Sequence, residues 1–200
     1  LDLAGVGMGC AAGDYDNDSV PDLAVSFSDR IALLRNLRGK FQDVTQQAGI
    51  RVEGLAAGLT FLDYDHDGDL DLYVPCMAAR ESGEQPSGAP PGNVLWRNNG
   101  NGTFTDLTAA TGLRGDAAGL AAVVTDFNND RAVDLVVTGW GDKPVLFANL
   151  REGPFRSLKP WPQEMASPTG GVAVLDFNKD GWMDLALTHW GAPGLTLWRN

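Results

Sequence analysis

The sequence predicts an all-β protein built from four copies of one four-stranded unit, and three observations support this fold class. One ten-residue acidic motif occurs four times, as DYDNDSVPDL, DYDHDGDLDL, DFNNDRAVDL and DFNKDGWMDL. Short apolar segments flank every copy in the same order. The 200-residue chain contains 25 Gly and 11 Pro and has no long helical periodicity, which is typical of strands joined by many turns. A four-stranded unit repeated about every 50 residues indicates the blades of a β-propeller.

Each unit begins with a small, apolar segment that we expect to form the innermost strand. It reads GMGCAAG, AAGLTFL, LAAVVT and GVAVL in the four units. Because Gly and Ala let neighbouring backbones approach closely, these segments suit the crowded centre of a propeller. After the acidic motif come a second segment (LAVSF, LYV, LVVT, LALT) and a third (LLRN, LWRN, LFAN, LWRN). A last segment, KFQDVT, TFTDLT or PFRSLK, completes the first three units.

The repeats divide the chain into residues 1–49, 50–112, 113–164 and 165–200, and the last unit is incomplete. Successive motifs start 49, 63 and 50 residues apart. An insertion rich in Pro, Gly and Ser near residues 79–92 explains the longer spacing and is expected to be a surface loop. A β-sandwich would also contain short strands, but it would not require the same cassette four times.

The charge of the chain argues against two kinds of partner. The formal net charge is −11, whereas nucleic acids and anionic membranes bind basic surfaces. No run of 18 or more apolar residues is present, so we expect no membrane insertion within this segment. The chain opens and ends inside a repeat unit, so we expect a fragment whose export signal lies outside it. Cys10 and Cys76 could form a disulfide or stay two separate thiols.

Each acidic motif has the oxygen pattern of a Ca²⁺ site. We call residues 14–23, 63–72, 126–135 and 176–185 loops 1 to 4 and number the positions of each from its first Asp. Side-chain oxygens occupy positions 1, 3, 5 and 9 of every loop, and Ca²⁺ takes about six to eight oxygen ligands. The candidate side-chain ligands are Asp14, Asp16, Asp18 and Asp22; Asp63, Asp65, Asp67 and Asp71; Asp126, Asn128, Asp130 and Asp134; and Asp176, Asn178, Asp180 and Asp184. The position-7 carbonyls, of Val20, Asp69, Ala132 and Trp182, would complete the sets, and the Asp69 carboxylate is expected to face solvent.

Other interpretations of the loops fit the residues less well. An EF-hand needs flanking helices and Glu at position 12, where these loops have Val or Leu. Mg²⁺ binds fewer protein carboxylates, and Zn²⁺ prefers His and Cys. The remaining alternative is a metal-free Asp/Asn turn held by bonds from side chain to backbone, but four copies of one oxygen pattern favour the metal. His66, at position 4, is expected to be a solvated loop residue.

The four loops are not expected to bind equally. Position 6 needs a sharp turn, which Gly supplies. Gly68 and Gly181 meet this need, so loops 2 and 4 are expected to be the strongest sites. Loop 1, which has Ser19 at position 6, is expected to be the next strongest site. Loop 3 is expected to be the weakest, because Arg131 at this position adds a positive charge.

In an up-and-down blade the connections alternate between two faces. The acidic loops and the Asn-Gly turns at 99–102 should therefore share one face, while the insertion, TGWGD and THWGAPG share the other. Trp140 and Trp190 on that second face are candidate ligand-binding residues for a sugar or peptide, and the alternative is that they pack between blades. Trp96 and Trp198 lie inside a strand motif and are expected in the core.

The cassette D-x-[DN]-x-D-G-x-x-D-L, followed by LWRN-N-G-x-G-x-F-x-D-L-T, resembles the FG-GAP/VCBS repeat family over essentially the whole chain. That family includes the integrin α-subunit propeller, and the chain is similar to its branch related to cartilage acidic protein and associated with ASPIC/UnbV segments. The resemblance implies a seven- or eight-bladed propeller, so the four repeats would form an open arc. It also implies Ca²⁺ at positions 1, 3, 5 and 9 of the loops and an extracellular, cell-surface or periplasmic location.

Three functions follow from these patterns. The first is an exported Ca²⁺-binding module that binds a protein or glycan ligand, for example in adhesion. The second is the Ca²⁺-stabilised propeller domain of a polysaccharide-degrading enzyme, and the third is a purely structural spacer. No nucleophile elbow, HExxH motif or phosphate-binding glycine loop is present, and the glutamates form no evident acid/base pair, so we expect no catalytic activity.

Overall fold

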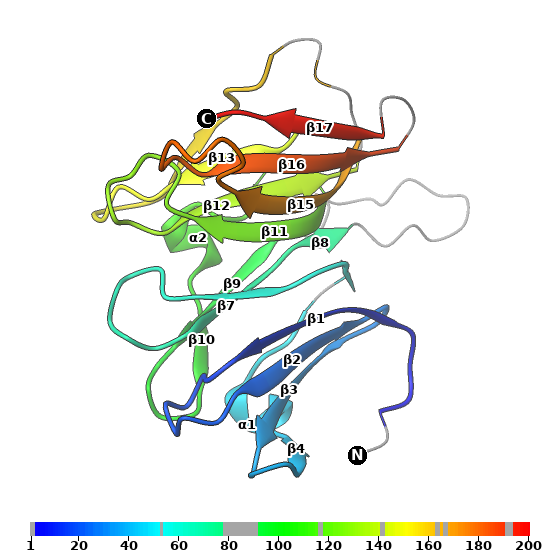
Figure 1. Cartoon of the computed structure of the whole chain (residues 1–200). Helices are drawn as coiled ribbons and strands as arrows, with labels where there is room; N and C mark the ends of the chain where they lie inside the picture. Colours follow the sequence, from blue (N-terminus) through cyan, green and yellow to red (C-terminus); the bar gives the residue numbers. More distant parts are fainter. Residues whose placement is uncertain are drawn as a thin grey trace.

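The structure is a computed structural model that describes residues 3–52, 54–77, 92–115, 118–140, 143–162, 165, 168–190 and 194–200 (Figure 1). Its strands form four small antiparallel sheets that follow one another in chain order as the blades of an open arc. This arrangement confirms the predicted all-β class and the four-bladed propeller arc. The insertion near 79–92 lies outside the described residues except for Gly92.

Within each blade the strands pair in chain order, as a meander. Blade 1 contains β1 (Gly7–Gly13), β2 (Asp22–Phe27), β3 (Ile31–Asn36) and β4 (Phe41–Asp43). Blade 2 contains β6 (Thr60–Leu62), β7 (Asp71–Val74), β9 (Val94–Asn98) and β10 (Phe104–Asp106), beside a short ladder of β5 (Leu55–Ala56) and β8 (Cys76–Met77). Blade 3 contains β11 (Gly119–Thr125), β12 (Asp134–Gly139), β13 (Val145–Ala148) and β14 (Arg156–Leu158). Blade 4 has three strands, β15 (Thr169–Leu175), β16 (Asp184–His189) and β17 (Leu195–Trp198).

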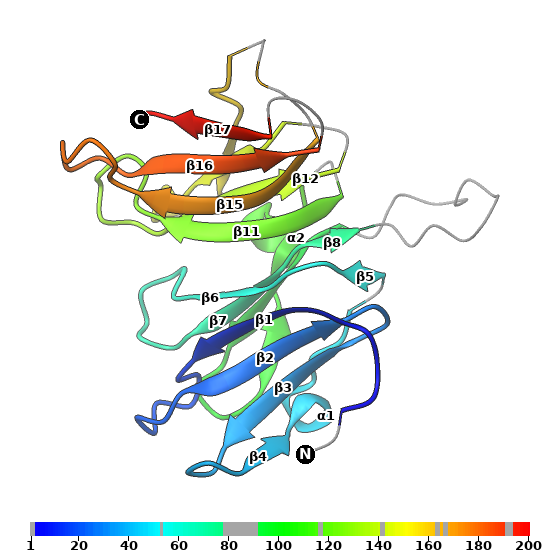
Figure 2. The same ribbon diagram turned by 45° about the vertical axis from the view of Figure 1, so that its right-hand side comes forward.

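The first strands of the blades lie next to one another. β1 contacts β6, β6 contacts β11, and β11 contacts β15, as Figure 2 shows. The backbones approach closely here, because a Cβ atom on Gly58 would lie 2.9 Å from the carbonyl oxygen of Leu120. A Cβ atom on Gly9 would lie 3.4 Å from the Cα atom of Gly58. The predicted role of the Gly- and Ala-rich segments at the crowded centre is therefore confirmed.

The core consists of the interfaces between successive blades. Alternate residues of the third strands divide between these interfaces, as the two-residue period of a strand requires. Leu33, Leu95 and Leu146 face the following blade, whereas Trp96, Phe147 and Trp198 face the preceding one. Trp96 is buried, and Trp198 stacks on Phe127 with 5.4 Å between ring centroids. Trp96 thus lies in the core, as the strand motif predicts, and the partly buried Trp198 packs against the core.

Two one-turn helices, α1 (Thr45–Ala48) and α2 (Thr108–Thr111), were not expected from the sequence. The first Thr of each donates its N–H and its hydroxyl to the Asp two residues earlier, at 3.0 and 2.6 Å for Asp43 and at 3.0 and 2.6 Å for Asp106. A Gly in the left-handed region then ends each helix. In the described part of the chain, no helix is long and apolar enough to cross a membrane.

The two cysteines are separate thiols. Cys10 is exposed in β1, and Cys76 is buried in β8. Of the two possibilities left open by the sequence, the structure therefore shows the second.

Candidate metal centre

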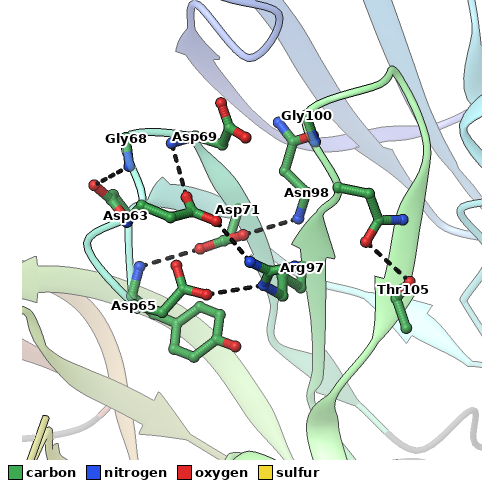
Figure 3. Close-up of polar contacts among 12 residues, drawn as sticks. Asp63, Asp65, Gly68, Asp69, Asp71, Arg97, Asn98, Gly100 and Thr105 are labelled. Carbon is green, nitrogen blue, oxygen red and sulfur yellow. Dashed lines mark hydrogen bonds and ion pairs between the residues drawn. The ribbon is translucent and has the colours of Figure 1, made fainter.

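The first Asp of every loop folds the loop around its own carboxylate. In loop 2, Asp63 accepts the N–H of Asp67 at 3.1 Å and the N–H of Gly68 at 3.2 Å (Figure 3). The six equivalent bonds of the other loops measure 2.8 to 3.1 Å. The Asp at position 5 then accepts the N–H of position 7 at 2.7 to 3.0 Å in all four loops. These bonds curl the chain so that positions 1, 3 and 5 lie on the inside of one turn.

Two residues of every loop adopt the left-handed conformation. At position 6, φ is 90° for Gly68 and 86° for Gly181, and it is still 67° for Ser19 and 68° for Arg131. The geometry that favours Gly is therefore present in all four loops, and the two substitutions bear its steric cost. Position 4 was not expected to need this conformation, yet φ there is 58°, 59°, 55° and 62° for Asn17, His66, Asn129 and Lys179. His66 is exposed, as expected.

The Asp at position 9 is completely buried in every loop, namely Asp22, Asp71, Asp134 and Asp184. In loop 2, Asp71 accepts the N–H of Tyr64 at 3.1 Å and the N–H of Asn98 at 2.8 Å (Figure 3). Desolvation raises the pKa of Asp71 to about 7, although these two donors oppose the shift. Desolvation also raises the pKa of Asp22 and of Asp134. A nearby cation would offset this cost of keeping a buried carboxylate charged.

Carboxylate oxygens converge in loops 1 and 2. One oxygen each from Asp14, Asp16 and Asp18 lies within 4.8 Å of the others, and the same holds for Asp63, Asp65 and Asp71. In loop 1, Oδ1 of Asp16 is buried and has no hydrogen-bond partner. An unsatisfied buried oxygen among hard oxygen donors fits Ca²⁺.

Loops 3 and 4 differ at position 3. Asn128 and Asn178 stand there, and each donates its Nδ2–H to the position-5 Asp, at 2.8 and 2.7 Å. Loops 3 and 4 therefore offer one carboxylate fewer to a cation. One oxygen of the Asp at position 5 already accepts a hydrogen bond from this Asn in each of them. By the number of converging carboxylates, loops 1 and 2 are the stronger candidate Ca²⁺ sites. By the glycine at position 6, loops 2 and 4 are the stronger candidates.

An arginine of the third strand lies against the loop in three blades. In blade 2, Nε of Arg97 is 2.8 Å from Asp65 and Nη2 is 2.7 Å from Asp67 (Figure 3). Arg35 pairs with Asp16 and Asp18 at 2.6 and 3.7 Å, and Arg199 pairs with Asp180 at 3.3 Å. This contact was not expected from the sequence, although its signal is visible as the Arg of LLRN and LWRN. The guanidinium supplies positive charge at the oxygens that a cation would use.

The Asp69 carboxylate was expected to contact only solvent, but it also contacts other parts of the protein. Its Oδ1 accepts the Nδ2–H of Asn17, in the loop of the neighbouring blade, at 2.7 Å. Its Oδ2 lies 2.8 Å from the place where a Cβ atom on Gly100 would be. The carboxylate therefore joins loop 2 to loop 1 and lies against the turn between β9 and β10.

Trp140 and Trp190 contact each other at the other end of the strands. Loops 3 and 4 end where β12 and β16 begin, whereas the two tryptophans directly follow the last residues of these strands. Their rings meet edge to face, with 4.0 Å between centroids and 78° between planes. The side chains still leave 41% and 58% of their surface exposed. The pair thus packs between blades 3 and 4 and also presents aromatic surface to solvent.

The repeated up-and-down blades, each with an acidic turn between its first two strands, define a repeat-built β-propeller. The model of the FG-GAP-like repeat matches residues 14–74, 86–137 and 126–187, so the chain belongs to this family, as the resemblance implies. No curated protein matches the sequence. Among solved structures, the fold is similar to that of an Agrocybe aegerita lectin that specifically recognises non-reducing terminal N-acetylglucosamine, with a TM-score of 0.57 and 17% identity. The similarity covers 94% of this chain and 48% of the lectin chain.

Proposed function

We propose that the chain is a non-catalytic Ca²⁺-stabilised propeller module that binds a glycan or protein ligand. The observation that carries this proposal is the convergence of Asp63, Asp65 and Asp71 within one loop. Asp71 is the first residue of β7 and also accepts the N–H of Asn98 at the end of β9. A cation held by these three carboxylates would therefore connect two strands of the blade. Its role would be to stabilise the fold and not to take part in catalysis.

In each loop the cation would be held by the side chains of positions 1, 3, 5 and 9 and by the carbonyl of position 7. For loop 2 these are Asp63, Asp65, Asp67 and Asp71, with the carbonyl of Asp69. Bound Ca²⁺ would supply two positive charges where carboxylates now repel one another. Because the folded loop alone gathers these oxygens, Ca²⁺ binding would add to the free energy of unfolding.

The proposed ligand surface lies around Trp140 and Trp190, at the strand ends away from the loops. Exposed tryptophan rings offer flat apolar area to sugars and peptides. The lectin similarity supports glycans as the first ligand class to test. An exported location, outside the cell or in the periplasm, is part of the proposal; the Ca²⁺ sites of extracellular modules have dissociation constants of roughly 10⁻⁴ to 10⁻³ M.

Glycan-array binding of the Ca²⁺-loaded chain tests the ligand surface, with a panel of hydrolase and lyase substrates alongside it. We expect Trp140→Ala and Trp190→Ala each to weaken binding at least about tenfold, as for aromatic residues that anchor ligands. Leu150→Ala is the control, because Leu150 is a large apolar residue that is 52% exposed and lies in the turn between β13 and β14, away from the two tryptophans. Unchanged binding in all three variants would place the ligand elsewhere, and turnover of a substrate would replace the non-catalytic proposal.

A further inference from the structure

One asparagine in each of blades 2, 3 and 4 connects the loop of its own blade to the loop of the preceding blade. The Nδ2–H group of Asn98, at the end of β9, donates to the carbonyl oxygen of Tyr15 in loop 1 at 2.7 Å. Asn149 donates to the carbonyl oxygen of Tyr64 in loop 2 at 2.8 Å. Asn200 makes the same contact with Phe127 of loop 3 at 2.6 Å. In all three cases the acceptor is position 2 of the preceding blade's loop.

The main chain of these residues continues the connection to the buried aspartates. From loop 1 to loop 2, the N–H of Tyr15 donates to Asp22 at 3.2 Å, Asn98 donates to the Tyr15 carbonyl, and the N–H of Asn98 donates to Asp71 at 2.8 Å. Two candidate ligands in different blades are thus joined through three hydrogen bonds. The equivalent three bonds join loop 2 to loop 3 and loop 3 to loop 4.

The three bonds from loop 1 to loop 2 are all buried, whereas some of those between the later loops are only partly buried. Asn98 is 1% exposed, Asn149 is 5% exposed, and the aspartates at position 9 are fully buried. Water cannot readily replace a lost partner there, so each bond has a strong effect on the orientation of its two peptide groups. The path is therefore a set of constrained contacts between blades.

We propose that Asn98 and Asn149 are positioning residues that couple cation binding in neighbouring loops. This inference rests on the proposed function. A cation that fixes Asp22 in loop 1 also fixes the Tyr15 peptide and, through Asn98, the N–H group that orients Asp71 in loop 2. Part of the ordering cost of loop 2 is then met before its cation binds, which is positive cooperativity without a change of fold.

The coupling is strongest between loops 1 and 2. These loops share a second contact, from Asn17 Nδ2 to Asp69 Oδ1 at 2.7 Å. Loops 3 and 4 share a weaker one, from Asn129 Nδ2 to the carbonyl oxygen of Gly181 at 3.4 Å. His66 occupies the same position in loop 2, and among the described residues it makes no such contact with loop 3.

The chain contains its own control for the asparagine. Asn36 ends β3 of blade 1, and its N–H donates to Asp22 at 2.7 Å, as in the other blades. Its Nδ2, however, donates to the carbonyl oxygen of Pro21 in its own blade at 2.9 Å. Asn36→Ala therefore removes the same side chain without removing a bond between loops 1 and 2.

The test is a Ca²⁺ titration followed by hydrogen exchange and mass spectrometry, which reports the protection of the loop 1 peptide separately. Asp65→Asn weakens the loop 2 site without touching loop 1. With Asn98 present, we expect this change to raise the Ca²⁺ midpoint of loop 1 by roughly fivefold or more. In the Asn98→Ala background the rise should be much smaller, because only the contact between Asn17 and Asp69 then joins the two loops, and in the Asn36→Ala background the full rise should persist.

Each result has a definite meaning. If Ca²⁺ protects no loop of the wild-type chain, the proposed function is wrong and the coupling falls with it. If Ca²⁺ protects the loops but Asp65→Asn does not affect loop 1, the coupling is overturned while the proposed function stands. An equal rise in the Asn98→Ala background also overturns the role of Asn98. If Asn98→Ala does not fold, Asn149→Ala gives the same test on loops 2 and 3.

Discussion

Arg97 and Asp65 form an ion pair in which 2.8 Å separates Nε from Oδ2, and the same guanidinium lies 2.7 Å from Asp67. The arginine thus holds two carboxylates that a cation in loop 2 would use. In blade 3 the matching residue is Ala148, and Arg151 donates instead to the main-chain carbonyl of Asp130 at 2.7 Å. The loops therefore differ in the positive group that competes for their oxygens as well as in their ligands.

Replacing Arg97 should strengthen Ca²⁺ binding to loop 2. In Arg97→Gln the like-charge repulsion and the competing ion pairs are removed, so we expect the dissociation constant measured by calorimetry to fall several-fold. The Ca²⁺-free protein should lose up to about 1 kcal/mol in free energy of unfolding, because the carboxylates lose their counter-charge. Arg156→Gln, an exposed change on β14, is the control and should alter neither quantity. Weaker Ca²⁺ binding in Arg97→Gln would mean that the arginine positions the ligands.

The stability of the Ca²⁺-free protein should decrease as the pH rises from about 4 to above 7. Burial raises the pKa of Asp71 to about 7 from its ordinary value of 3.8, so in this window the folded chain binds more protons than the unfolded chain. The free energy of unfolding therefore falls with rising pH, and the loss is complete once the pH passes the folded pKa. Urea unfolding with a chelator at pH 5 and pH 8 measures the change, and Asp71→Asn should reduce it. A pH dependence identical in the variant would contradict this assignment.

The left-handed turn of loop 2 should require Gly68. Its φ is 90°, and no atom lies within 4 Å of an added Cβ, so Gly68→Ala changes the backbone energy and not the packing. We expect a loss of roughly 1–2 kcal/mol in the free energy of unfolding, measured by urea denaturation. Gly7→Ala is the matched control, because its Cβ also meets no atom and its φ is ordinary. If both changes have equal effects, the turn is not strained.

The contact between the innermost segments of blades 2 and 3 should depend on Gly58. An added Cβ would lie 2.9 Å from the main-chain oxygen of Leu120, which a side-chain rotation cannot relieve. Gly58→Ala should therefore cost about 1–3 kcal/mol in thermal unfolding experiments. Gly194→Ala, where nothing lies within 4 Å, should cost far less. A neutral effect of Gly58→Ala would indicate that the blades stand further apart than in the structure.

Local patterns were enough to predict the blades and the loops. The acidic motif and the Gly-rich segments repeat, so one interpretation of a unit applies to all four. The short helices were missed, although DVTQQAG and DLTAATG both carry an Asp-x-Thr start and a Gly stop. The Arg of the third strand was likewise visible but was read only as part of a strand.

Contacts between blades could not be predicted from the sequence alone. Asn98 and Tyr15 are 83 residues apart, and Asn149 and Tyr64 are 85 apart. No local period connects such pairs, because their meeting depends on the angle between blades. The same holds for Asp69, which bonds to Asn17 and was expected to face solvent. The candidate ligand types were therefore predictable, but the links that join the loops were not.

A thermal melt of the chain in Ca²⁺ and in chelator tests whether the acidic loops are Ca²⁺ sites that stabilise the blades. Ca²⁺ at 100 times its dissociation constant would raise the free energy of unfolding of the chain by about 2.7 kcal/mol for each site that it occupies. For a chain of this length we therefore expect Tm to rise by about 5 to 10 °C. Mg²⁺ at the same concentration should give a much smaller rise, because it prefers fewer protein carboxylates. An equal Tm in Ca²⁺ and in chelator would contradict the account of the loops as Ca²⁺ sites that brace the blades.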